Sequence, residues 1–130
     1  MINLLKFNKQ YYQQIQDGKK TQTLRTKNKR LTENEIVKAI FPGTTNEIKI
    51  QILETGYKQF KYLDEEDAKR EGYNTLEELK KDLMKIYPTL DFMTRLYYYR
   101  FMKKSLTNAH IYKEKTGPGR PGPVKRSVFR

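Results

Sequence analysis

Two neighbouring segments that alternate apolar and polar side chains constrain the fold more than any other feature of this chain. They are EIVKAIF (residues 35–41) and EIKIQILETGYKQF (residues 47–60). The apolar positions of the pattern include Ile36, Ile48, Ile50 and Ile52. A period of two is typical of strands that bury one face. Because PGTTN between the segments carries residues that form tight turns, the pattern predicts an antiparallel strand pair.

Three further segments are predicted to form strands. They are INLLKF (residues 2–7), TQTLR (residues 21–25) and RLYYYRFMKK (residues 95–104). In the second of these, alternation places Thr21, Thr23 and Arg25 on one face. The third is rich in aromatic residues, which favours a strand, although a helix of the same length also fits.

The last segment contains three consecutive tyrosines, Tyr97, Tyr98 and Tyr99. Successive side chains of a strand point to opposite faces, so these three cannot all face the core. At least one is expected to be exposed, where it could stack on a nucleobase or pack against a neighbouring helix.

Helices are predicted on both sides of the strand pair. NKQYYQQIQDG (residues 8–18) begins with Asn8 as N-cap and stops at Gly18, with Tyr11, Tyr12 and Ile15 on one face. LDEEDAKREG (residues 63–72) starts with the acidic side chains that suit a helix N-terminus.

A third helix is predicted for TLEELKKDLMKIYP (residues 75–88). It opens with the capping box Thr75-x-x-Glu78 and closes at Pro88. Its apolar positions recur at helical spacing and are expected in the core: Leu76, Leu79, Leu83 and Ile86. Together the elements predict one α+β domain over residues 1–105. Residues 106–130 contain GPGRPGPV, which can build neither helix nor sheet, so they are expected to form an extended tail.

The charge balance favours a polyanionic partner. The 130 residues include 27 Lys and Arg against 15 Asp and Glu, a net charge of +12. A field of this size attracts nucleic acid or anionic lipid. No basic amphipathic helix with a long apolar face is visible, so a membrane partner is not expected. Many ribosomal proteins thread a basic tail rich in Gly and Pro along RNA, and ribosomal RNA, with ribosomal proteins as neighbours, is therefore the expected partner.

Composition disfavours several other classes. The chain has no Cys, and His110 is its one histidine, so a thiolate or transition-metal centre is not expected and no cofactor is predicted. Neither a secretory leader nor a run of about 20 apolar residues is present, which predicts a cytoplasmic protein.

The order of motifs over residues 2–104 resembles the ASCH domain of the PUA-like superfamily. One carrying motif is Gly-x-Lys-Thr-x-Thr-x-Arg, which spans Gly18 to Arg25. The other is the acidic helix followed by Glu-Gly and Tyr-Pro, which spans Asp64 to Pro88. The resemblance implies a small β-barrel with flanking helices and a cleft that binds RNA or a nucleotide-derived ligand.

The same resemblance carries an enzymatic alternative. Small bacterial proteins of this kind are N4-acetylcytidine amidohydrolases, and their catalytic positions match Lys20, Thr23 and Glu71 here. Ribonuclease activity also occurs among ASCH proteins. Amide hydrolysis needs a nucleophile, a base and a proton donor for the leaving amine, and these three side chains could supply them. Lys20 could act as the base only when deprotonated, and Glu71 could instead pair with a nearby cation on its helix.

The candidate RNA contacts fall in two clusters of basic residues. The first follows the predicted helix 8–18, and the second lies in the tail. They are Lys19, Lys20, Arg25, Lys27, Lys29, Arg30, Arg120, Lys125, Arg126 and Arg130. Arg25 suits a carbonyl or phosphate, because its planar donors bind two oxygens at once. A basic cluster can also be only a solvated surface.

We expect the affinity of the full-length chain for RNA to depend steeply on salt. If the two clusters neutralise about six to ten phosphates, affinity should fall roughly a thousandfold or more between about 50 and 200 mM salt, because bound counterions are released. Fluorescence anisotropy over a salt series measures the slope. Deletion of residues 107–130 should lower this slope, while circular dichroism shows that the domain remains folded. An affinity of the intact chain that does not change with salt would contradict a polyanionic partner.

Overall fold

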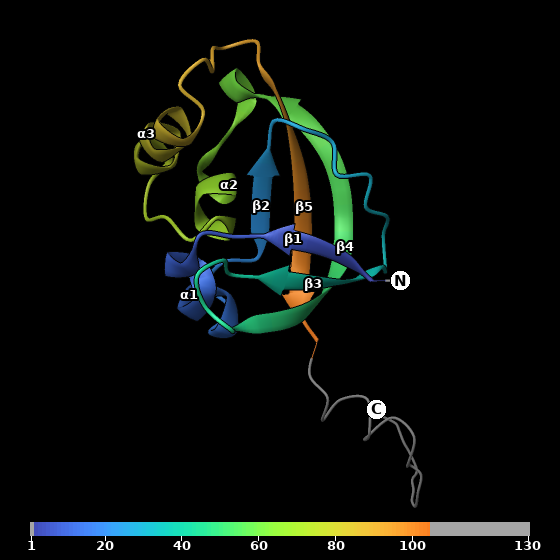
Figure 1. Cartoon of the computed structure of the whole chain (residues 1–130). Helices are drawn as coiled ribbons and strands as arrows, with labels where there is room; N and C mark the ends of the chain where they lie inside the picture. Colours follow the sequence, from blue (N-terminus) through green and yellow to red (C-terminus); the bar gives the residue numbers. More distant parts are fainter. Residues whose placement is uncertain (1, 105–130) are drawn as a thin grey trace, which may run out of the picture.

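A five-stranded mixed sheet forms the centre of the computed structural model, which describes residues 2–104 (Figure 1). The strands are β1 (Asn3–Lys6), β2 (Gln22–Arg25), β3 (Ile36–Ile40), β4 (Glu47–Gln59) and β5 (Arg95–Lys103). Their order in the sheet is β1-β3-β4-β5-β2. β1 is parallel to β3, and the other pairs are antiparallel. All predicted strands are confirmed, including the aromatic one.

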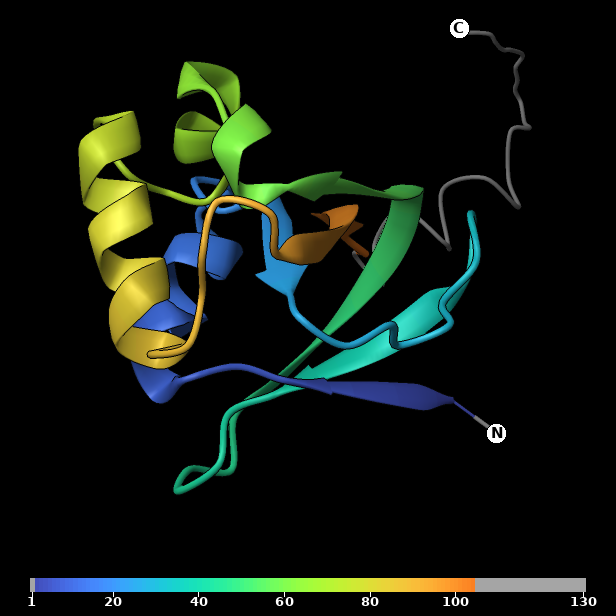
Figure 2. The same cartoon turned by 90° about the horizontal axis from the view of Figure 1, so that it is seen from above.

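The long strands β4 and β5 curve, so the sheet forms half of a barrel (Figures 1 and 2). β1 and β2 are its two edges. Three α-helices flank the sheet: α1 (Tyr12–Gln16), α2 (Glu65–Arg70) and α3 (Leu76–Ile86). This arrangement confirms the predicted α+β class, with an open half-barrel in place of a closed barrel. Within residues 2–104, no helix has both the length and the apolar character needed to cross a membrane.

The core-facing register of β3 differs from the predicted one. Val37 and Ala39 are fully buried and pair with Ile50 and Ile48 of β4, as expected for that strand. Ile36 instead pairs with a polar residue and is only half-buried. Strict alternation puts Ile36 and Val37 on opposite faces, and the sequence contains apolar residues at both positions, so the pattern alone could not choose between them.

The predicted helix over residues 8–18 is shorter than expected and begins with a 3-10 turn (Lys9–Tyr11). Asn8 caps that turn, since its side chain accepts a hydrogen bond from the backbone N–H of Gln10. Gly18 ends the segment with φ of +77°, a conformation that glycine adopts without steric cost. The predicted first cap and the predicted stop are thus both confirmed.

Helix α3 begins at the predicted cap, where the Thr75 hydroxyl accepts a hydrogen bond from the backbone N–H of Glu78. Leu79 and Leu83 are buried as predicted, and Leu76 is half-buried. The prediction for Ile86 is wrong, since 53% of its surface is exposed. This residue ends the helix at the mouth of an open pocket and does not pack on the sheet.

The sheet separates two apolar cores. One fills the half-barrel, and the other lies between the sheet and helices α2 and α3. β5 serves both, because Tyr99 packs in the first and Leu96 in the second. Tyr97 and Tyr98 are half-buried against the first and the second core respectively, so none of the three tyrosines is fully exposed. The predicted tail, residues 106–130, lies outside the described residues.

We expect Leu79→Ala to lower the free energy of unfolding by about 2–5 kcal/mol, because it leaves a cavity in the core under α3. Ile86→Ala, in the same helix, is the matched control and should change it by no more than about 0.5 kcal/mol. Urea denaturation followed by circular dichroism measures both. Equal losses for the two variants would contradict the placement of α3.

Candidate functional site

A buried ion pair joins the start of β2 to the end of α2. The Lys20 Nζ atom lies 2.9 Å from Oε1 of Glu71, and each residue is only 4% exposed. The same ammonium group donates to the backbone carbonyl of Glu71 at 3.3 Å. Next to this pair, the backbone N–H of Thr21 donates to the carbonyl of Arg70 at 2.7 Å. The chain therefore holds Lys20 and Glu71 together although 51 residues separate them.

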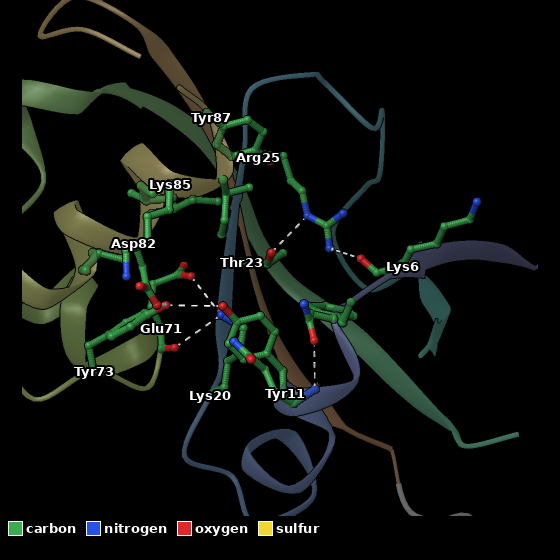
Figure 3. Close-up of a pocket in the computed structure, with 17 residues that line it drawn as sticks. Lys6, Tyr11, Lys20, Thr23, Arg25, Glu71, Tyr73, Asp82, Lys85 and Tyr87 are labelled. Atoms are coloured by element: carbon green, nitrogen blue, oxygen red, sulfur yellow. Dashed lines mark hydrogen bonds and ion pairs between the residues drawn. The ribbon is translucent and has the colours of Figure 1, made fainter. Parts of the chain in front are cut away.

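The ion pair lies at a cavity of about 370 Å³ between β2, α3 and the turn that precedes α1 (Figure 3). Lys20, Thr23 and Glu71, the three residues matched to the catalytic positions, all line it. This volume is within the range of small-molecule sites. The structure thus brings together the residues that the sequence placed in one candidate site. Other residues that line the cavity are Lys6, Phe7, Tyr11, Arg25, Tyr73, Asp82, Lys85 and Tyr87.

Burial sets the electrostatics of Glu71. Desolvation raises the pKa of this carboxyl above its ordinary value, and the adjacent Lys20 ammonium opposes that rise. Oε2 of Glu71 is buried without a hydrogen-bond partner among the described residues. An unsatisfied buried acceptor costs about 1–3 kcal/mol.

Arg25 bridges the two edges of the half-barrel beside the pocket. Its Nε donates to the Thr23 hydroxyl at 3.1 Å, and its Nη2 donates to the backbone carbonyl of Lys6 at 2.8 Å. The guanidinium also lies over the Phe7 ring. Burial lowers the pKa of Arg25, but an arginine remains protonated at neutral pH. Because these bonds use two of its five N–H groups, the others are free to bind a ligand oxygen.

Sequence reasoning missed a second polar cluster in the pocket, around Tyr73 (Figure 3). The Tyr73 hydroxyl donates to Asp82 Oδ2 at 2.6 Å and lies 3.3 Å from the Tyr11 hydroxyl. Burial is the largest cause that raises the pKa of Tyr73, and the Asp82 carboxylate is the next, so the proton stays on the Tyr73 hydroxyl. Tyr11 also covers the Lys20 ammonium, which lies 4.8 Å from the centre of its ring. The one signal in the sequence that could have pointed to Tyr73 is its position directly after Glu71-Gly72.

The remaining candidate RNA contacts lie outside this pocket. Lys19, Lys27, Lys29 and Arg30 are exposed, the last three in the loop after β2. Lys20 is buried in the ion pair and cannot act as a surface cation. The tail residues lie outside the part of the chain that the structure describes: Arg120, Lys125, Arg126 and Arg130. Between residues 2 and 104, no three His, Cys, Asp or Glu side chains cluster in a way that could hold a metal ion.

Comparison with solved structures identifies the fold. The chain is similar to an ASCH domain from Lactobacillus crispatus JV V101, with a TM-score of 0.59 and 13% identity over 70% of this chain and 68% of that one. It is also similar to protein EF3133 of the DUF984 family from Enterococcus faecalis V583, with a TM-score of 0.65 and 14% identity over 86% and 82%. The chain has an ASCH-like fold.

A third structure, a point mutant of the ASCH protein from Zymomonas mobilis, matches this ASCH-like chain with a TM-score of 0.55 and 11% identity, over 95% of this chain and 89% of that one. No protein-family model matches the sequence. No curated protein matches it either. At these identities the likeness concerns the fold, so the role of the pocket has to come from its own chemistry.

We expect Lys20→Met to destabilise the protein in a pH-dependent way. At neutral pH the variant should lose about 3–5 kcal/mol of unfolding free energy, because Glu71 is left buried and charged without a partner. Removing the ammonium raises the pKa of Glu71 further, so the folded state binds a proton more readily than the unfolded state. The loss should therefore shrink as pH falls toward the ordinary range of a glutamate.

Urea denaturation at a series of pH values between neutrality and the onset of acid unfolding measures this effect. The double variant Lys20→Met/Glu71→Leu is the control, since it removes both charges and should regain most of the stability. A loss that is independent of pH, or that persists in the double variant, would show that packing and not the unpaired carboxylate is responsible.

Proposed function

We propose that this ASCH-like protein binds RNA and accepts a nucleobase of that RNA in the Lys20–Glu71 pocket. The observation that carries the proposal is a cavity of about 370 Å³ lined by the Lys20–Glu71 pair and by Arg25, on a chain with a net charge of +12. The charge attracts a polyanion, and the pocket offers a shaped acceptor for one part of it. The ASCH-like fold agrees with the RNA-related ligand that the sequence resemblance implies.

The lining of the pocket suits a base better than a phosphate. The Glu71 carboxylate in the pocket wall can accept from an amino or imino N–H, which every nucleobase of RNA carries on its pairing edge. Tyr11, Tyr73 and Tyr87 contribute aromatic rings to the wall, and such rings favour planar ligands. Arg25 at the β2 edge, with its unused N–H groups, can bind the sugar-phosphate oxygens of the same nucleotide.

We propose structured RNA, first of all ribosomal RNA with its proteins as neighbours, as the partner in the cell. The support for this partner comes from the sequence outside the pocket. Residues 107–130 contain six basic side chains and one acidic side chain, Glu114, with Gly and Pro between them. Binding of a single nucleoside would not require such a segment. Sedimentation of the native protein in a cell lysate tests the partner: it should move with ribosomal subunits at low salt and separate from them at high salt.

Hydrolysis of N4-acetylcytidine is the second candidate function, favoured by the hydrogen bond from Arg25 to the Thr23 hydroxyl. In this reaction the Thr23 oxygen attacks the acetyl carbon and its proton passes to Lys20. The C–N bond breaks, N4 of cytidine takes up a proton, and water releases acetate from Thr23. The Arg25 cation, which donates to the Thr23 hydroxyl, would stabilise that oxygen as it gives up its proton, before negative charge develops on the acetyl carbonyl oxygen.

The base in this mechanism is the amine form of Lys20, which exists when Glu71 holds the shared proton. Burial favours this neutral arrangement, since it raises the pKa of Glu71. The ion pair opposes it, because each charge stabilises the other across 2.9 Å. Lys20 is in contact with Glu71, Thr23 is in contact with Arg25, and all four residues line one pocket. Catalysis would depend on how the substrate shifts the proton within the Lys20–Glu71 pair.

We expect Glu71→Gln to weaken the binding of ribonucleoside 5′-monophosphates about 10- to 100-fold. The amide can keep its oxygen toward Lys20 only by turning its N–H₂ donors toward the ligand's own donor. Isothermal titration with each of the four monophosphates measures the change. Glu66→Gln is the matched control on α2, because that side chain is 65% exposed, and it should leave affinity unchanged. Wild-type protein that binds none of the four would contradict a base-binding pocket.

The enzymatic alternative predicts a different result for Lys20→Arg. This variant should abolish release of acetate from N4-acetylcytidine while RNA affinity is retained, because arginine keeps the charge but cannot serve as a base near neutral pH. Thr23→Val removes the hydroxyl at nearly constant volume and should be equally inactive. Lys19→Arg, next to Lys20 but exposed, is the matched control.

Liquid chromatography of the nucleoside products provides the readout, and unfolding curves on the same variants show whether the pocket is intact. Wild-type protein without turnover above buffer would exclude this hydrolase activity and leave the pocket as a binding site. A denaturing gel on the RNA samples monitors the ribonuclease alternative. Strand cleavage by wild type but not by Lys20→Arg would assign cleavage to the pocket in place of deacetylation.

A further inference from the structure

A second concave site lies on the inner side of the half-barrel, between the β2–β3 loop (residues 26–35) and the adjoining ends of β4 and β5. Its cavity measures about 500 Å³. We name it the Tyr57 groove, and the lining residues that matter here are Arg30, Thr55, Tyr57, Arg95 and Tyr97. None of these five lines the Lys20–Glu71 pocket.

The groove is built on a rigid support. The hydroxyl of Tyr99, on β5, accepts from the backbone N–H of Lys29 at 2.7 Å and donates to the Asn28 side chain at 3.1 Å. Farther along the loop, the N–H of Asn34 donates to the carbonyl of Ile52 on β4 at 2.7 Å. The loop is thus fixed to both strands that it crosses (Figure 1).

A β-bulge places Tyr57 on the same side of the sheet as the pocket residue Arg25. The pairing of β4 with β5 shifts between Ile52 and Glu54, which inserts one residue and reverses the alternation of β4 beyond that point. In the shifted register Tyr57 pairs with Tyr97, and Tyr97 pairs with Arg25 of β2. Directly paired residues point to the same face, so the three side chains form a row across three strands.

This row connects the two cavities. Arg25 lines the Lys20–Glu71 pocket, whereas Tyr97 and Tyr57 line the groove. Neighbouring strands are about 4.8 Å apart, so the row is about 10 Å long from Arg25 to Tyr57. One chain of nucleotides could therefore follow it from the pocket into the groove.

The chemistry of the groove suits single-stranded nucleic acid. Tyr57 has 61% of its surface exposed, and the Arg95 guanidinium lies 4.3 Å from the centre of its ring. Neither Arg95 nor Arg30 forms a salt bridge with any carboxylate among residues 2–104. An open aromatic ring beside unpaired cations is how proteins bind bases by stacking and phosphates by charge, without reading the sequence.

We propose that the Tyr57 groove is a second subsite for single-stranded RNA, in which a base stacks on Tyr57 while Arg30 and Arg95 bind the flanking phosphates. The proposal rests on the RNA-binding function of the pocket and extends it from one nucleotide to a short strand. Because stacking needs an unpaired base, the groove selects single-stranded over duplex RNA.

Fluorescence anisotropy with a labelled RNA hexanucleotide of mixed sequence tests the groove. Tyr57→Ala should weaken hexanucleotide binding about 5- to 100-fold, and Tyr57→Phe should retain it because the ring is kept. Arg95→Gln should weaken binding and reduce the slope of affinity against salt by about one. A blunt-ended RNA duplex should bind with an affinity that Tyr57→Ala does not change.

Tyr62→Ala is the matched control. Tyr62 is 62% exposed and carries a lysine, Lys61, over its ring, but it lies in the 3-10 turn after β4 (Phe60–Tyr62) and not in the groove. This variant should bind the hexanucleotide like wild type. If Tyr62→Ala and Tyr57→Ala weaken binding equally, the effect belongs to any exposed tyrosine and the groove is not a subsite.

Nucleoside monophosphates separate this proposal from the function of the pocket. Tyr57→Ala should leave monophosphate affinity unchanged, whereas Glu71→Gln should lower it. If Glu71→Gln weakens hexanucleotide binding and Tyr57→Ala does not, the groove is excluded and the pocket function stands. If Tyr57→Ala weakens hexanucleotide binding while no monophosphate binds to wild type, the pocket function fails and the groove binds RNA by itself. A wild-type protein that does not bind the hexanucleotide overturns the groove proposal.

Discussion

The buried ion pair between Lys20 and Glu71 is the interaction on which the site depends. It fixes the start of an edge strand to the end of α2. Taking two charges out of water is costly, and a buried pair often stabilises a fold no better than apolar residues would. Its retention beside an unpartnered carboxylate oxygen is therefore easier to understand as a binding or catalytic feature than as a structural one.

Because the sheet is open, the Lys20–Glu71 pocket and the Tyr57 groove share one of its faces. Because β1 and β2 do not pair, the Arg25 guanidinium bridges the gap between them and leaves a pocket at that edge. The bulge in β4 then turns Tyr57 toward the same face. A regular strand would have directed Tyr57 toward the helices, where α2 and α3 cover the sheet (Figure 2). One inserted residue thus decides that the aromatic ring of Tyr57 lies on the same face as Arg25.

Binding and catalysis make different demands on the same groups. A base-binding pocket needs the Glu71 oxygen to stay where a ligand can donate to it, and the ion pair with Lys20 provides that. A hydrolase also needs a proton to move within the pair during each turnover. Burial raises the pKa of Glu71 and the Lys20 ammonium opposes that rise, so both demands fall on the same carboxyl group.

Much of the fold could be predicted from the sequence, because strands and caps are governed by local rules. The alternating isoleucines of β4, the Thr75 cap and the stop at Gly18 depend on neighbours within a few residues, and each occurs where the pattern predicts. The resemblance to the ASCH domain, carried by the motif around Lys20 and the Glu-Gly step at Glu71, also implied which residues belong to one site. Ile36 and Ile86 were assigned wrongly, since an apolar residue next to another apolar residue, or at a helix end, has no local signal for its face.

Only the tertiary structure decided how these pieces meet. The contacts of Tyr73 with Asp82 and Tyr11, the bridge from Arg25 to the backbone of Lys6, and the row from Arg25 to Tyr57 join residues on different elements. Their positions depend on strand order, on the bulge in β4 and on the depth at which each side chain is buried. Such properties arise from packing between distant segments. The sequence by itself therefore indicated that Lys20, Thr23 and Glu71 belong to one candidate site, whereas the fold determined which other side chains meet them there.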